Sequence, residues 1–141
     1  MAETKIEWAD VVWNPVVGCS RVSEGCRNCY AERMARRLVA MDVHAYDGTM
    51  NARGWTGQVN EVPEALGKPS HWKNPQRVFV NSMSDLFHPS VRVEYIANVW
   101  AVMGIEDRHT YMVLTKRADR MMEVLNSQEF QDEYRDCVRI L

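Results

Sequence analysis

Three cysteines lie close together near the start of the chain, at Cys19, Cys26 and Cys29. Six residues separate the first two cysteines, and two residues separate the second and the third. Thiolates are soft ligands, so a short loop that carries three of them is typical of a zinc site or an iron–sulfur cluster. In a four-iron cluster, three cysteines leave one iron open to a small molecule. The spacing therefore predicts a metal centre, and the residues alone leave iron–sulfur and zinc both open.

A fourth cysteine, Cys137, lies far from this group in the sequence. A fourth thiolate would complete an all-cysteine zinc site or a closed electron-transfer cluster. Because no second cysteine lies near Cys137, we predict that it is a structural thiol. The zinc-ligand role is kept as the alternative.

Polar side chains follow two predicted strands, 78–80 and 110–115, at the point where each strand ends. They are Asn81, Ser82, Ser84 and Asp85 after the first strand, and Lys116 and Arg117 after the second. The carboxyl ends of parallel strands meet at one edge of a sheet, where ligand sites of α/β folds lie. We predict that these residues bind a cofactor: the amide and carboxyl groups suit a ribose or an amino group, and the cations suit a carboxylate or phosphate. Taken singly, each residue has a structural alternative: Ser and Asp commonly cap helices, and Lys and Arg are common in loops.

The elements that must position these residues follow from the hydrophobic pattern. The order of strands and helices indicates an α/β fold with right-handed crossovers and about three parallel strands. We expect a short strand within 1–18, a helix over 28–41, an irregular segment 42–76, a strand at 78–80, a helix at 93–104, a strand at 110–115, and helices at 119–126 and 127–141.

Several local expectations accompany this pattern. Tyr30, Met34, Leu38 and Met41 recur at helical spacing, which predicts the apolar face of the first helix. Glycines immediately precede Cys19 and Cys26, as suits a loop with positive φ wrapped around a compact centre. Among the four histidines, only His88 lies beside the predicted polar cluster.

Length and composition narrow the class of protein. A chain of 141 residues predicts a single domain, and 46% hydrophobic residues are enough for a core. The formal net charge of −2 argues against a broad electrostatic grip on nucleic acid. We find no apolar run that would span a membrane and no secretion signal, so we expect a cytoplasmic protein whose thiols stay reduced.

Five segments together resemble the phage-type three-Cys-motif proteins. This uncharacterised family of phages and bacteria is regarded as related to radical S-adenosylmethionine (SAM) enzymes. The similar segments are 4–8, 13–19, 25–34, 78–87 and 113–117, in that order along the chain. The resemblance covers most of residues 4–125.

The resemblance implies a partial (β/α) barrel of radical-SAM type. Its first loop would hold a 4Fe–4S cluster through Cys19, Cys26 and Cys29, and the open iron would chelate SAM. Reductive cleavage of SAM would then give a 5′-deoxyadenosyl radical that takes hydrogen from a substrate, with the protein supplying orientation. The chain departs from the usual radical-SAM loop, which has three residues between its first two cysteines. It is also expected to be truncated, as the N-terminal half of a longer domain.

The resulting hypothesis is a radical-SAM-like iron–sulfur protein that modifies an unknown substrate. Nucleic acid and a host macromolecule are the open substrate classes, and a partner protein or the missing C-terminal half is the expected partner. A phage-encoded copy would work in the host cytoplasm. The alternative is a zinc-stabilised or catalytically inactive phage protein that acts as a host-interaction module.

Overall fold

The computed structural model describes residues 6–20 and 30–141. Its central sheet has three parallel strands, β1 (Val11–Trp13), β6 (Arg77–Val80) and β7 (Thr110–Val113), in the order β1-β6-β7. Val78 on β6 lies between Val11 on β1 and Tyr111 on β7. The predicted α/β class with three parallel strands is confirmed, and within the described residues the strands do not close a barrel.

The main core lies on one face of this sheet. Val11, Trp13, Val78 and Val80 are fully buried there, at alternate positions along β1 and β6. Side chains alternate between the faces of a strand, so their neighbours Val12 and Phe79 point to the opposite face, where both are only partly buried. The apolar burial that stabilises the sheet is therefore concentrated on its helix-covered side.

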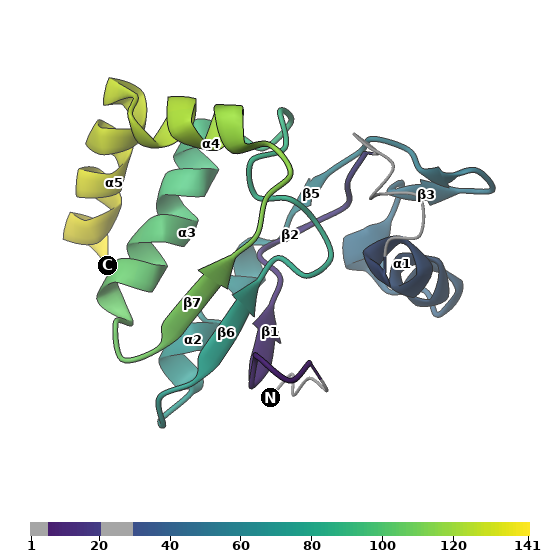
Figure 1. The fold of residues 1–141 in the computed structure, drawn as a ribbon, viewed down its shortest axis with the longest axis horizontal. Coiled ribbons are helices and arrows are strands. Elements are labelled where there is room, and N and C mark those ends of the chain that lie inside the picture. The colour runs from purple at the N-terminus through teal and green to yellow at the C-terminus, as the bar shows by residue number, and fades with distance from the viewer. Residues whose placement is uncertain (1–5, 21–29) are drawn as a thin grey trace.

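Three helices lie together on the β7 side of the sheet, as Figure 1 shows. They are α3 (Val93–Ile105), α4 (Ala118–Leu125) and α5 (Gln128–Ile140). Trp100 on α3 meets the rings of Phe87 and Phe130 edge-on, with centroid separations of 6.0 and 6.2 Å. Helix α5 is capped at its N-terminus by Ser127, whose hydroxyl accepts a hydrogen bond from the Phe130 amide.

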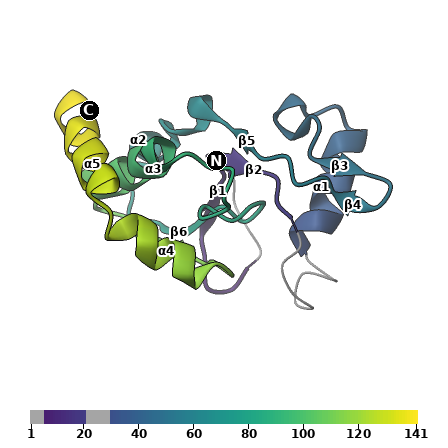
Figure 2. The ribbon, with the colours of Figure 1, turned by 90° about the horizontal axis from the view of Figure 1, so that it is seen from above.

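A second, smaller lobe surrounds α1 (Tyr30–Ala40). Figures 1 and 2 both place α1 at the opposite end of the molecule from α5. An antiparallel pair, β2 (Val16–Val17) with β5 (Asn60–Glu61), joins the lobe to the sheet. The remaining elements are η2 (His44–Tyr46), β3 (Met50–Asn51), β4 (Gly54–Trp55), η3 (Pro63–Ala65) and α2 (Lys68–His71).

The first helix forms as expected, and the middle of its predicted apolar face, Met34 and Leu38, packs against the core of the lobe, whereas the ends of that face are exposed. Tyr30 is 55% exposed and Met41, beyond the helix end, is 67% exposed, whereas Ala31 and Ala35 are buried. The helix packs against η2, β3 and β4 instead of the parallel sheet. Alanine allows the close approach of a neighbouring backbone, so the small residues face the lobe and the larger ones flank them.

The expectation for segment 42–76 was wrong. The segment is not irregular, because it contains three two-residue strands and two kinds of short helix. The strand expected at 110–115 forms over Thr110–Val113 as β7, an edge strand whose residues are exposed or partly buried. In the described ranges, no helix is long and apolar enough to cross a membrane.

Differences in burial predict that two isoleucines on helices contribute very differently to the free energy of unfolding. Ile96 is fully buried under the sheet, whereas Ile140 is 85% exposed. Ile96→Ala should lower the free energy of unfolding by about 2–5 kcal/mol, since it removes buried methyl groups and leaves a cavity. Ile140→Ala should change it by less than about 0.5 kcal/mol. Urea unfolding followed by circular dichroism measures both, and equal effects would contradict the described packing.

Candidate functional site at the carboxyl end of the sheet

A pocket of about 180 Å³ opens at the carboxyl ends of β6 and β7. Cys19 and all six polar residues that the sequence predicts for the site line it. The six are Asn81, Ser82, Ser84, Asp85, Lys116 and Arg117. The rest of the lining is Thr115, Ala31, Phe79 and Leu114. Pockets for drug-sized ligands measure roughly 300–1,000 Å³, so the described walls hold a fragment, such as one sugar or amino-acid moiety. The structure thus brings the predicted residues together.

The backbone around Gly18 carries Cys19 to this pocket. The Gly18 amide donates to the Met83 carbonyl at 3.1 Å, and Gly18 forms a parallel bridge with Ser84. Gly18 has a φ of +99°, and a Cβ there would lie 2.4 Å from the carbonyl oxygen of Gln58. Only glycine fits this position, so the expectation of a positive φ before the first cysteine is confirmed.

The carboxylate of Asp85 organises the rim of the pocket. It accepts hydrogen bonds from the Thr115 hydroxyl at 2.7 Å, the Phe87 amide at 3.0 Å and the Lys116 amide at 3.0 Å. It also pairs with the Arg117 guanidinium at 3.1 Å. The side chains of the pair are only 8% and 10% exposed. Asp85 therefore ties the segment after β6 to the segment after β7.

Arg117 links this carboxylate to the start of the cysteine loop. One terminal nitrogen, Nη1, lies 3.9 Å from Cys19 Sγ, and Nη2 donates to the Ser20 carbonyl at 3.2 Å. Burial raises the pKa of the Cys19 thiol, and the hydrogen bond and charge of Arg117 act in the opposite direction. With its guanidinium occupied in this way, Arg117 anchors the start of the cysteine loop at Cys19 and Ser20, and its predicted role in binding a cofactor stays a prediction.

Asn81 has an unusual backbone and an unsatisfied side chain. Its φ is +58°, a left-handed conformation that asparagine tolerates better than most residues. Its Oδ1 accepts a hydrogen bond from the Val16 amide at 3.2 Å, which orients the amide group and leaves Nδ2 as the donor on the other side. Within the part of the chain that the structure describes, Nδ2 is buried with no hydrogen-bond partner. Such an orphaned donor is costly unless an acceptor is supplied.

The two serines make local contacts. Ser82 donates its hydroxyl hydrogen to Asn14 Oδ1 at 3.2 Å, and Ser84 donates to the Val16 carbonyl at 2.8 Å. Both bonds hold the segment after β6 against the chain that leads to Cys19. These contacts give both hydroxyls a structural role, although neither hydroxyl caps a helix, and both residues line the pocket.

His88 and Ser20 form a pair that resembles a nucleophilic dyad in distance but not in protonation. His88 Nε2 lies 2.9 Å from Ser20 Oγ, and His88 Nδ1 accepts a hydrogen bond from the Ser90 amide. The proton of the neutral ring is therefore on Nε2, which donates to Ser20. A general base would need the opposite tautomer, so this geometry positions Ser20 and does not activate it.

The remaining cysteines complete the comparison with the sequence. Cys26 and Cys29 lie outside the described residues, so the predicted three-thiolate group stays a prediction. Among the residues that are described, no three potential ligands of the Cys, His, Asp or Glu type gather. Cys137 lies on α5, where its thiol donates to Asn98 Oδ1 on α3 at 3.1 Å. That contact supports the structural role predicted for Cys137.

Sequence analysis missed two residues of this site, Ser20 and Asn14. Ser20 directly follows Cys19, so its proximity to any metal centre could have been inferred. Asn14 precedes Pro15 at the end of β1, and its Oδ1 also accepts from the Met83 amide at 3.2 Å. The break after β1 was a signal that this position carries side-chain hydrogen bonds.

Comparison with known proteins identifies a family. Its model carries the description "Protein of unknown function (DUF5131)" and matches residues 3–138. The chain belongs to the DUF5131 family. No curated protein and no solved structure shows a significant match to the chain. The DUF5131 description assigns no activity, so functional argument depends on the pocket itself.

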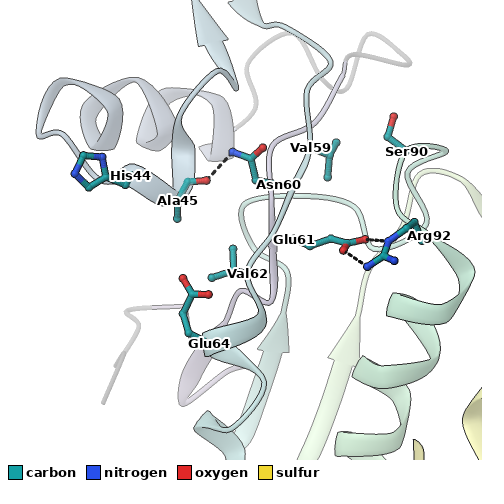
Figure 3. A pocket seen from close by; sticks show the side chains of 9 residues that line it. All are labelled: His44, Ala45, Val59, Asn60, Glu61, Val62, Glu64, Ser90 and Arg92. Carbon is teal, nitrogen blue, oxygen red and sulfur yellow. Dashed lines mark hydrogen bonds and ion pairs between the residues drawn. The ribbon is translucent and has the colours of Figure 1, made fainter. Parts of the chain in front are cut away.

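A larger hollow of about 610 Å³ lies elsewhere on this DUF5131 chain, between β5 and the start of α3. Figure 3 shows that its central polar groups already face one another. Arg92 binds both carboxylate oxygens of Glu61, and Asn60 donates to the Ala45 carbonyl. None of the residues predicted from the sequence lines it. The pocket beside Cys19 is therefore the stronger candidate.

Two aspartate–arginine pairs, one near each end of β6, allow a matched test of how much the buried pair at the pocket rim stabilises the protein. Asp85→Ala should lower the free energy of unfolding by about 3–5 kcal/mol, because Arg117 would be left buried without its counter-ion. Asp10 pairs with Arg77 at the opposite end of the strand, where both side chains are exposed. Asp10→Ala should have a much smaller effect. Chemical denaturation of both variants tests this, and comparable losses would contradict the rim's special role.

His88 predicts a pH dependence of stability. Burial, and then the nearby Arg117 charge, lower the pKa of His88 below its ordinary value near 6.5. The unfolded chain therefore binds a proton more readily than the folded one. The His88 contribution is fully present above about pH 6.5 and is lost as the pH falls through the lower, folded pKa. Unfolding measured from pH 8 to 5 should show this loss, and His88→Gln should lack it. Parallel curves for the two proteins would contradict the prediction.

Proposed function

We propose that this chain is a radical-SAM-like iron–sulfur protein of partial (β/α) barrel type. One observation carries the proposal: Cys19 and the polar ends of two parallel strands line a single pocket. Carboxyl ends of parallel strands are where α/β folds place ligands and catalytic groups. A thiolate ligand beside donor-rich strand ends is the arrangement that a cluster-bound cofactor requires.

The residues at the pocket fit such a group. Cys19 supplies a free thiol at the rim, and Cys26 and Cys29 would supply the other two ligands of a 4Fe–4S cluster. The buried, unpaired Nδ2 of Asn81 would donate to an acceptor oxygen or nitrogen of SAM. Lys116 would contribute positive charge near the cofactor's carboxylate. When bound, the cluster supplies one electron for reductive cleavage of SAM.

The protein's own part is to orient and shield. The bonds from Asp85 to Thr115 and Lys116 hold the ends of β6 and β7 in a constant relation. Phe79, Ala31 and Leu114 give the pocket an apolar wall, which limits water around a reactive species. The described walls match the size of one part of SAM, such as its sugar or its amino-acid moiety.

Anaerobic reconstitution tests the cluster. Protein incubated with ferrous iron and sulfide should bind both and, after reduction with dithionite, give an electron paramagnetic resonance (EPR) signal. Cys19→Ser, Cys26→Ser and Cys29→Ser should each lose most of the iron, because each removes a ligand. Cys137→Ser should keep it, since that thiol bonds to Asn98.

The outcomes separate the alternatives. Isolation with about one zinc per chain and no iron would favour a zinc-stabilised interaction module. Iron retained with an EPR spectrum that SAM does not change would contradict the SAM site while keeping the cluster. A spectrum that changes with SAM, followed by release of 5′-deoxyadenosine under reducing conditions, supports the full proposal.

A further inference from the structure

The guanidinium of Arg117 touches three groups at once. It pairs with Asp85 at 3.1 Å, donates to the carbonyl and hydroxyl oxygens of Ser20 at 3.2 and 3.3 Å, and approaches Cys19 Sγ to 3.9 Å. Only 10% of its side chain is exposed. An arginine fork held from one side by a carboxylate has few other orientations, so its position relative to the sulfur is constrained.

We propose that Arg117 is a positioning residue that holds Cys19 at the pocket and raises the reduction potential of the cluster bound there. This inference rests on the proposed function. Ligation turns Cys19 into a thiolate, and one-electron reduction adds further negative charge to the centre. Hydrogen bonds and positive charge near ligand sulfur stabilise the more negative, reduced state. In a buried setting these interactions are screened less than in water.

The Asp85 carboxylate does not cancel the stabilisation of the reduced cluster by Arg117. Arg117 lies within hydrogen-bonding range of the Cys19 sulfur, whereas Asp85 reaches it only through the arginine. The carboxylate therefore serves to aim the guanidinium, and the guanidinium acts on the sulfur.

His88 supports the same segment from a second direction. Its Nε2 donates to Ser20 Oγ, the atom that also accepts from Arg117 Nη2. Ser20 is thus held through its hydroxyl by two side chains and through its carbonyl by one. The residue next to Cys19 is fastened to the sheet edge before any metal binds, which lowers the ordering cost of ligation.

The test is a potentiometric titration of the reconstituted full chain, with dithionite as the electron donor and the EPR signal of the reduced cluster as the readout. Arg117→Gln removes the charge and the fork, and Arg117→Lys keeps the charge alone. Arg77→Gln makes the same change of charge at the other end of β6, where Arg77 pairs with exposed Asp10. Iron and sulfide content are measured for each protein.

We expect the midpoint potential of Arg117→Gln to be more negative than that of the wild type. This shift should exceed any shift in Arg77→Gln. The midpoint potential of Arg117→Lys should lie between those of the wild type and Arg117→Gln. Equal potentials at full iron content would overturn it and leave Arg117 a structural residue only. If Arg117→Gln fails to hold iron, Arg117→Lys decides by the same criterion. Loss of iron from both variants also overturns the tuning role, and absence of a cluster in the wild type overturns the proposed function with it.

Discussion

The buried ion pair between Asp85 and Arg117 joins three segments that are far apart in the chain. Asp85 belongs to the turn after β6, Arg117 follows β7, and the contacts of Arg117 with Ser20 bring in the start of the cysteine loop. A buried charge without its partner is strongly unfavourable, so neither residue can leave alone. The relation between these segments is therefore set by charge neutralisation and by the hydrogen bonds that complete it.

The sheet supplies the platform for this arrangement. Burial of Val11, Trp13, Val78 and Val80 fixes the register of β1 and β6. Register in turn decides which residues emerge together at the carboxyl edge. The packing of the hydrophobic core therefore determines where Asn81 and Asp85 lie at the end of β6. In this way the packing of the core affects the geometry of the pocket through the few residues that directly follow each strand.

Much of this could be inferred from the sequence. Continuous apolar runs identified β6 and β7, and the rule that ligand sites follow parallel strands grouped Asn81, Asp85 and Arg117 correctly in space. The two-residue strands of segment 42–76 could not be predicted, because elements that short carry no periodicity. The spacing placed Met34 and Leu38 correctly on the packed side of α1, but it could not show that Tyr30 and Met41 at the ends of the stripe are exposed. The preoccupation of Arg117 with Asp85 and Ser20 depends on tertiary contacts that no local pattern encodes.

The position of β7 affects how the chain behaves while it folds. In the described part of the molecule β7 pairs only with β6, and its four residues, Thr110–Val113, include neither a charge nor a proline. Charged residues and prolines on edge strands commonly prevent edge-to-edge association between molecules. Before the helices have packed, the unpaired edge of β7 can form hydrogen bonds with the same strand of another molecule. Refolding at low protein concentration should accordingly recover more monomer than refolding at high concentration.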